Sequence, residues 1–513
     1  MRQMKKSTLF TITLLTALSI LLGAVSCASG GSDETTPAQN AGTEAGEPTA
    51  EVTEAVDTDW SIDLGKMNFG GEKVNMLVIG MEPSDDEFTA AEINGGLVND
   101  AVYTRNSLVE EDLGVEFVFT LSSKSDVNDV GNRVRNDVKT GLYEFDIVTI
   151  PGYTHTAYAL EGDFVNLLRV NNLNLDKHYW TQGFNVIMSN GRRQYVASGA
   201  YSLSMIRYMY ITLYNKTAMS ARGLPDLYEF ASAGKWTVGK QLELIKGLYD
   251  DANGDLKRDD KDFYGFVSGT YTSVDPYWVG FDMPVLAVDK STGEFSIVLS
   301  ESKLTGILDV IRNLIIDNPD TWNRGSGLGA VDGSDAVIAL KIFSEENCAM
   351  TTAMIYSIEK SLTSSGFSGD YGIVPMPKYD EDQEEYRTHV QDKLSLMAIV
   401  SNSPEEKRDM LGAVMEDTAY RSRTEVFPAY YESALSYRYL QNAESKEMLD
   451  LVYNSIRIEG TFIYSASFAF LGQLRTLATL SGTSSGASQI RTGLNNLNKK
   501  LKSFNEAMAK LTD

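Results

Sequence analysis

Short apolar runs alternate with amphipathic stretches along the first part of the chain. Residues 73–79 (KVNMLVI), 115–121 and 145–150 are rich in β-branched and aromatic side chains, which predicts three strands. Residues 97–113 and the stretch after Asp126 repeat apolar side chains every three or four positions, which predicts two helices, the second capped by Asp126. Strands that alternate with helices are typical of parallel βαβ units.

In parallel sheets of this kind, ligands bind beyond the carboxyl ends of the strands. The pattern therefore predicts a site near residues 81–82 and 152–153. Further short strands are predicted at residues 348–355, 371–374 and 394–400.

The C-terminal stretch has the pattern of an amphipathic helix. From Ile490 onward its apolar side chains lie on one helical face: Leu494, Leu497, Leu501, Phe504, Met508 and Leu511. The spacing approaches a heptad, but packing onto the chain's own fold is favoured over a coiled-coil dimer. We therefore expect a monomer.

The first 26 residues have the pattern of an export signal peptide. Three basic residues precede an apolar run over residues 9–23, which is too short to span a membrane. The sequence Ala24-Val25-Ser26-Cys27 resembles a bacterial lipobox, in which cleavage leaves an acylated cysteine, carrying for example palmitate. We expect a lipoprotein anchored through Cys27 on the extracytoplasmic face of the cell membrane. The alternative is a plain secretory signal in which Cys27 is incidental.

Residues 28–59 contain eight acidic side chains and no Lys or Arg. This composition, rich also in Ala, Gly, Thr and Ser, predicts a disordered tether. Residues 27–66 are therefore interpreted as the lipidated cysteine and an acidic linker, with the folded part beginning near residue 67.

The length and net charge of the chain limit the number of lobes and the kinds of partner that we expect. A chain of 513 residues is long enough for two well-filled cores, so two lobes are expected. The formal net charge is −25, and removal of the basic signal makes it more negative still. Such a chain repels nucleic acid and anionic lipid headgroups, so neither is expected as a partner.

The cysteines and histidines indicate neither an internal disulfide nor a zinc site. Only Cys27 and Cys348 are present, so an acylated Cys27 leaves no internal disulfide. Cys348 lies in an apolar run, where a small buried hydrophobic side chain is expected. The three histidines form no i,i+4 pair, which argues against a histidine-based zinc site.

Five segments, in the same order along the chain, resemble the bacterial extracellular solute-binding proteins of family 1, the sugar receptors of ABC importers. They are residues 94–117, residues 145–168, Tyr214-Asn215-Lys216 with residues 234–237, residues 371–386, and residues 427–435. The resemblance implies an α/β, two-lobed periplasmic-binding-protein-like fold of type II. Each lobe would be a mainly parallel sheet flanked by helices, and hinge crossings would join the lobes.

The resemblance also implies the lobe boundaries and the function. Lobe 1 would comprise residues 67–200 and 372–418, and lobe 2 residues 203–370 and 421–513. The ligand would be a carbohydrate, most simply an oligosaccharide, held in the cleft between the lobes and delivered to the transmembrane subunits of an ABC permease. No catalysis is expected.

A sugar site needs aromatic faces for stacking and polar groups for hydroxyls. The aromatic candidates lie in predicted loops or at crossings: Tyr153, Tyr201, Tyr271, Tyr277, Trp278, Trp322, Tyr356, Tyr430 and Tyr431. The candidate acceptors are Glu82, Asp282 and Asp392. Trp278 is the leading candidate, and for every ring the alternative is a place in the core.

Residues 251–262 resemble a calcium loop. Its oxygen donors would be Asp251, Asn253, Asp255, the Lys257 carbonyl, Asp259 and Asp262. Leu256 stands at the sixth position, where Gly is usual, so a solvated acidic loop is the alternative. No other cofactor is expected.

Two other functional classes compete with a sugar receptor. A secreted carbohydrate-active enzyme would also have carboxylates in an aromatic cleft, but the chain contains no Walker A motif and no recognisable acid–nucleophile pair. An adhesive surface lipoprotein, or a receptor for peptides or other polar solutes, also fits the composition.

Overall fold

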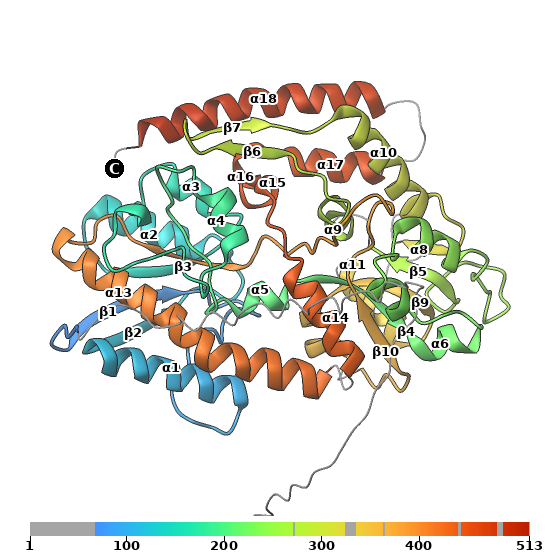
Figure 1. The fold of residues 1–513 in the computed structure, drawn as a ribbon, viewed down its shortest axis with the longest axis horizontal. Helices are drawn as coiled ribbons and strands as arrows, with labels where there is room; N and C mark the ends of the chain where they lie inside the picture. The colour runs from blue at the N-terminus through green and yellow to red at the C-terminus, as the bar shows by residue number, and fades with distance from the viewer. Residues whose placement is uncertain are drawn as a thin grey trace, which may run out of the picture. The chain divides into compact units, whose positions relative to one another are not determined.

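The computed structural model describes most of the chain after the linker (Figure 1). The described residues are 67–269, 272–323, 335–362, 365–439, 443–479 and 486–511. The predicted signal peptide, Cys27 and the acidic linker lie outside them. No helix in these described ranges is both long and apolar enough to cross a membrane.

The first sheet has four strands in the order β11-β3-β1-β2. They are β1 Glu72–Val78, β2 Val115–Leu121, β3 Ile147–Pro151 and β11 Ser395–Ile399. Strand β1 pairs in parallel with both β2 and β3, whereas β11 runs antiparallel to β3. The predicted βαβ units are therefore confirmed, and helix α1 (Leu97–Leu113) has the bounds that the sequence predicts.

Helix α2 (Asp129–Thr140) begins later than its predicted cap. Asn128 occupies the N-cap position without a side-chain capping bond, and the Asp126 carboxylate accepts the N–H of Asn128 at 2.9 Å. The predicted N-cap role of Asp126 is therefore wrong, because its side chain closes a turn just before the helix instead.

The second sheet has five strands in the order β10-β4-β9-β5-β8. They are β4 Tyr210–Asn215, β5 Tyr264–Ser268, β8 Thr321–Asn323, β9 Cys348–Met354 and β10 Tyr371–Val374. Strand β4 is antiparallel to both neighbours, and β5 pairs in parallel with β8 and β9. Strands β6 (Leu286–Asp289) and β7 (Glu294–Ile297) form a separate hairpin.

The pairing of strand β10 differs from one predicted boundary between the lobes. We expected the chain to return to lobe 1 at residue 372, but β10 pairs with β4 in the second sheet. The return therefore falls between Val374 and Ser395, where β11 joins the first sheet. Here the first lobe is the part of the chain built on the first sheet, and the second lobe is the part built on the second sheet.

Helices cover both sheets (Figure 1). Besides α1 and α2, the α-helices are α3 His155–Ala159, α4 Gln182–Met188, α5 Leu203–Arg207, α6 Lys216–Ala221, α7 Leu227–Ser232, α8 Val238–Ile245, α9 Asp275–Gly280, α10 Glu301–Ile311, α11 Asp335–Ser344, α12 Ile355–Ser357, α13 Glu405–Arg421, α14 Ala443–Asn454, α15 Gly460–Ile463, α16 Ser465–Phe468, α17 Phe470–Thr479 and α18 Gly486–Lys510. The π-helical segments are η3 Arg312–Ile316, η5 Ile358–Leu362, η6 Ser422–Val426 and η7 Pro428–Tyr439, and the 3₁₀ turns are η1 Leu167–Arg169 and η2 Thr272–Val274.

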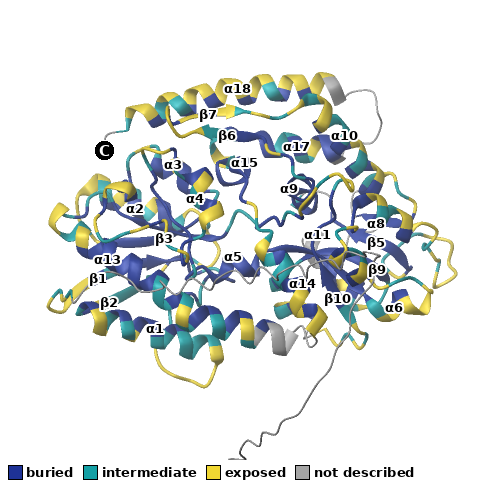
Figure 2. Cartoon of the chain, viewed as in Figure 1, coloured by how far each residue is buried: buried dark blue, intermediate teal, exposed yellow. Residues whose placement is uncertain are grey.

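Strand β1 shows why the first sheet needs helices on both faces. Val74, Met76 and Val78 pack into the cluster that contains α1 and α13 side chains, whereas Leu77 and Ile79 pack into the cluster that contains α2 side chains. Alternate side chains of a strand point to opposite faces, so both faces of this sheet are buried. Figure 2 shows most strand residues of the two sheets as buried, whereas the edge strand β2 is mostly of intermediate exposure.

Two further predictions from the apolar pattern are confirmed. Helix α18 packs on β7, α16 and α17, and its Leu497 and Phe504 are buried. Cys348 is fully buried in β9, and burial raises the pKa of its thiol. Both stretches thus contribute to the core.

Candidate ligand-binding site

Three predicted polar residues lie at one edge of the first sheet. Glu82 follows the carboxyl end of β1, Tyr153 follows that of β3, and Asp392 precedes the antiparallel β11. The Tyr153 N–H donates to the Asp392 carbonyl at 2.8 Å, which fixes these two residues side by side. A Cβ on Gly152 would lie 2.7 Å from the same carbonyl, so the close approach needs a glycine. The sheet thus gathers the residues where the strand pattern places them.

The second sheet presents an edge to the same place. Its antiparallel register sets Tyr210, the first residue of β4, opposite Met354, the last residue of β9. The chain then continues from β9 through Tyr356 into η5.

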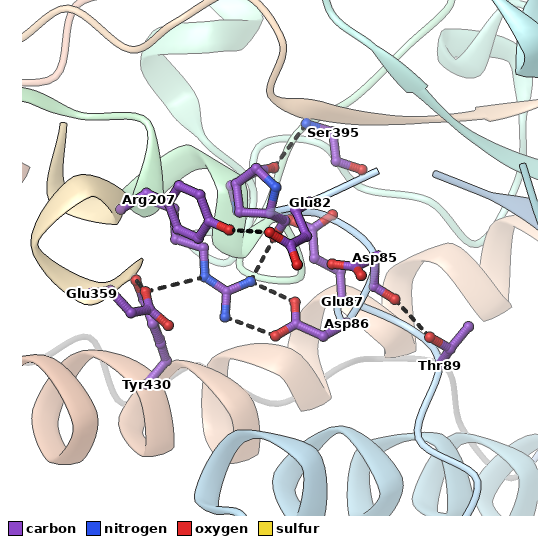
Figure 3. Close-up of polar contacts among 12 residues, drawn as sticks. Glu82, Asp85, Asp86, Glu87, Thr89, Arg207, Glu359, Ser395 and Tyr430 are labelled. Carbon is purple, nitrogen blue, oxygen red and sulfur yellow. Dashed lines mark hydrogen bonds and ion pairs between the residues drawn. The ribbon is translucent and has the colours of Figure 1, made fainter. Parts of the chain in front are cut away.

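Glu82 joins these two edges directly. The Tyr356 hydroxyl donates to Glu82 Oε2 at 2.8 Å, and the Lys360 ammonium donates to Glu82 Oε1 at 2.9 Å. These two hydrogen bonds, that of Lys360 first, lower the pKa of Glu82. Figure 3 places Glu82 close to the groups around Arg207. Both oxygens of this carboxylate are therefore engaged in contacts between the two lobes.

The carboxylate of Asp392, unlike that of Glu82, has no side-chain partner among the described residues. Asp392 is half-buried, and no side chain in the described part of the chain donates a hydrogen bond to its carboxylate. Burial raises the pKa of Asp392 to about 6, although Arg475 and Lys393 act in the other direction. Such a carboxylate gains more than an exposed one from a new donor, because burial has already removed part of its hydration.

Aromatic hydroxyls and a buried ion pair surround Asp392. Burial, followed by the charge of Asp392, raises the pKa of the half-buried Tyr153. The buried Tyr208 also has a raised pKa, from burial and then from the charges of Glu87 and Asp392. Arg475 of α17, whose charge also acts on Asp392, donates two hydrogen bonds to Asp275 of α9, and the one from Nε is 2.8 Å long. The site therefore combines a free acceptor with aromatic side chains.

Six of the predicted aromatic residues lie in the core instead. Their exposed fractions are at most 4%: Tyr201, Tyr277, Trp278, Trp322, Tyr430 and Tyr431. For these rings the alternative of a place in the core holds, because an aromatic side chain beside a strand end can equally pack inward. Their part in ligand binding stays a prediction.

Particular contacts hold several of these rings in place. The Tyr201 hydroxyl donates to the Ala197 carbonyl at 2.7 Å, and the Tyr431 hydroxyl donates to Asp450 at 2.8 Å. The indole N–H groups of Trp278 and Trp322 are buried without an acceptor among the described residues.

The other two candidates give no further support to the site. Tyr271 lies outside the described residues. Asp282 accepts a hydrogen bond from Arg387 at 3.2 Å, so this acceptor already has a cationic partner.

The predicted calcium loop folds as a turn. Asp251 accepts the backbone N–H groups of Gly254, Asp255 and Leu256, and Leu256 adopts a φ of 61°. The described residues, which include this whole loop, contain no group of three or more acidic, histidine or cysteine side chains that could hold a metal ion. The six predicted ligands, Asp251, Asn253, Asp255, Lys257, Asp259 and Asp262, lie in and around this turn, and their binding of calcium stays a prediction.

Sequence reasoning missed the cationic side of this site. Lys360, Arg207 and the two acidic partners of Arg207, Asp86 and Glu359, were not among the predicted residues. The acidic run Asp85-Asp86-Glu87 in the loop after the first strand was a signal that could have drawn attention to a buried cation.

The fold is one that other proteins share. Two α/β lobes, each with its own sheet, are joined by segments that cross between them, which is the two-lobed fold of periplasmic solute-binding proteins. No protein-family profile matches the chain, and no curated protein sequence matches it either.

Solved structures of sugar-binding proteins share the fold. The galacto-N-biose/lacto-N-biose I-binding protein of an ABC transporter from Bifidobacterium longum, in complex with lacto-N-biose, is 15% identical, with a TM-score of 0.55 over 85% of this chain and 98% of that one. The maltose-binding protein MalE from Listeria monocytogenes, in complex with maltose, is 13% identical, with a TM-score of 0.54 over 86% and 99%. The cyclic α-maltosyl-1,6-maltose-binding protein from Arthrobacter globiformis is 13% identical, with a TM-score of 0.51 over 85% and 100%.

Proposed function

We propose that the chain is the substrate-binding lipoprotein of an ABC importer, which captures a carbohydrate, most simply an oligosaccharide, between its lobes and delivers it to the membrane permease. The observation that carries this proposal is the free, half-buried carboxylate of Asp392 beside Tyr153, where the edges of the two sheets meet. The shared fold with proteins solved in complex with lacto-N-biose and maltose supports it.

The chemistry of this place suits a neutral polyhydroxylated ligand. A carboxylate has about four acceptor positions, and sugar hydroxyls can donate to those that no protein group uses. Tyr153 offers both a ring face for C–H groups and a hydroxyl for a further hydrogen bond. A ligand that contacts both lobes stabilises the arrangement in which they lie together, since only that arrangement offers all its contacts.

Anchoring is part of the same proposal. Acylation of Cys27 and the acidic linker would confine the receptor near its permease and raise its effective concentration there. Substitution of Cys27 by Ser is expected to abolish palmitate labelling and release the protein from membranes. Unchanged labelling and fractionation would contradict the anchor while leaving ligand binding untouched.

The decisive test is a binding screen on the purified full chain. Thermal unfolding is measured with maltose, lacto-N-biose and longer oligosaccharides, with glycerol at the same concentration as the control. We expect at least one sugar to raise the unfolding temperature by several degrees, because a ligand that binds only the folded state stabilises it. The sugar recovered after long incubation should be unchanged. Failure of every sugar to stabilise the chain, or release of hydrolysis products, would contradict the proposal.

A further inference from the structure

Arg207 lies where the two lobes and the segment that crosses between them meet. It is the last residue of α5, just before the chain enters the second sheet at β4, and its side chain is 4% exposed. Toward the first lobe, Nη1 donates to the Pro83 carbonyl at 2.6 Å and Nη2 donates to Asp86 Oδ2 at 2.8 Å (Figure 3). Both acceptors belong to the loop that follows β1.

The same guanidinium contacts two further segments. Its Nε lies 3.7 Å from Glu359 Oε2 on η5, directly after the second sheet's β9 and α12. Its Cζ lies 4.8 Å from the centre of the Tyr430 ring on η7, and the Tyr430 hydroxyl donates to Glu359 at 2.9 Å. One buried side chain thus connects the crossing segment with three other elements.

A buried guanidinium tolerates this position only because acceptors and anions surround it. Removing one partner of a buried ion pair leaves an uncompensated charge, so the surrounding loops are constrained to keep Asp86 and Glu359 in place. These charges and the Tyr430 hydroxyl raise the pKa of Arg207 despite its burial. The contact is therefore specific in its geometry as well as in its charge.

The two loops that Arg207 holds also carry the contact between the sheet edges. Glu82 precedes Pro83 in the first-lobe loop, while Tyr356 and Lys360 flank Glu359 in the second lobe. The Glu82 carboxylate accepts hydrogen bonds from both. Arg207 and Glu82 thus tie the same two segments at adjacent positions.

We propose that Arg207 is a positioning residue: it sets the first-lobe loop and the second-lobe segment relative to each other, so that both halves of the ligand site are in register before a ligand binds. This inference rests on the proposed function for its consequence, but not for its structural content. Arg207 acts through Glu82, Tyr356 and Lys360 and has no contact with the ligand in this proposal.

Hydrogen–deuterium exchange of the full chain without ligand tests the positioning. The variants are Arg207→Met and the milder Asp86→Asn, whose site is half-exposed and compatible with folding. The matched control is Arg312→Met, because Arg312 is also buried but pairs with Asp309 of the adjoining helical turn, at 2.6 Å. We expect amide exchange to rise several-fold in residues 81–90 and 355–362 together, and to stay unchanged elsewhere.

Three outcomes would overturn the proposal: faster exchange in only one of the two segments, faster exchange spread over the whole chain, or the same pattern in the Arg312 control. If Arg207→Met does not fold, Asp86→Asn decides the question alone. Arg207→Lys is expected to restore part of the protection, since an ammonium can reach Asp86 but cannot make two parallel hydrogen bonds.

A second readout links the inference to binding. With maltose or lacto-N-biose as the probe, whichever stabilises the native chain, Arg207→Met should weaken affinity several-fold, because the binding-competent arrangement becomes less populated. Unchanged affinity beside the expected exchange pattern would overturn this link to the site. Failure of all probes to bind the native chain would instead count against the proposed function, and the exchange result would still decide the positioning.

Discussion

Glu82 and Asp392 lie at the same edge of the first sheet, yet their surroundings differ completely. Glu82 is exposed, its two oxygens accept hydrogen bonds from Tyr356 and Lys360, and its pKa is lowered. Asp392 is half-buried, receives no hydrogen bond from a described side chain, and has a raised pKa. The comparison shows that two carboxylates which look equivalent in the sequence differ in pairing: one joins the lobes, and the other keeps the acceptor positions that the proposed function assigns to a ligand.

The cations near the two carboxylates should differ most in their effect on stability. Arg475→Met leaves Asp275, which is 4% exposed, without its partner, and should lower the free energy of unfolding by about 3 kcal/mol. Lys360→Met removes the exposed cation at Glu82 and should leave the free energy of unfolding nearly unchanged. Urea denaturation of both variants measures the difference. Equal losses would mean that the buried pair behind Asp392 is no more important than the surface pair.

The next largest difference is expected in ligand affinity, when each of the two carboxylates is replaced by its amide. Asp392→Asn removes charged acceptors that a sugar would use, and should weaken binding of the stabilising sugar about tenfold or more. Glu82→Gln should weaken it only about twofold to fivefold, because the amide oxygen can still accept a hydrogen bond from Tyr356 or Lys360. Isothermal titration calorimetry gives both values. A larger loss of sugar affinity in Glu82→Gln than in Asp392→Asn would mean that Glu82, and not Asp392, is the main acceptor for the sugar.

The pH dependence offers a finer distinction. The folded-state pKa of Asp392, about 6, lies above its unfolded value of about 4. Its ionisation therefore opposes folding, and its contribution to stability falls as the pH rises between these values. A ligand that donates to the carboxylate favours the ionised form, so affinity should fall as the pH drops below about 6.

Asp392→Asn should remove this fall in affinity, whereas Glu82→Gln should keep it, since the pKa of Glu82 is lowered and Glu82 stays ionised in this range. Titrations at pH 7 and pH 5 with the same sugar measure both. An identical pH profile in native protein and Asp392→Asn would exclude Asp392 as the group responsible.

The smallest effect is expected from calcium. The described residues, which include the loop at residues 251–262, contain no group of three or more acidic, histidine or cysteine side chains that could hold a metal ion, and we expect Ca²⁺ added after chelation to change the unfolding temperature by less than about 1 °C. A rise of several degrees that Asp262→Asn abolishes would support the calcium prediction instead.

Local patterns predicted about half of the strands and two of the long helices, α1 and α18, but not the long helix α13. The bounds of α1, β2 and β10 follow from apolar periodicity, because in those stretches local spacing and burial agree. The parallel sheet, and with it the strand-end position of Glu82 and Tyr153, follows from the alternation of strands and helices. The start of α2 was missed because the side chain of Asp126 closes a turn ahead of the helix.

The sequence by itself determined the alternation of elements, the two-lobed architecture and the acidic charge, since each depends on neighbouring residues or on simple counts. Only the tertiary structure decided which polar groups remain free. Trp278 looked like a ligand platform and is in the core, whereas Asp392 has no side-chain partner among the described residues. Arg207 gained its importance from partners 121 and 152 positions away. Burial and pairing depend on contacts between distant segments, which local spacing does not encode.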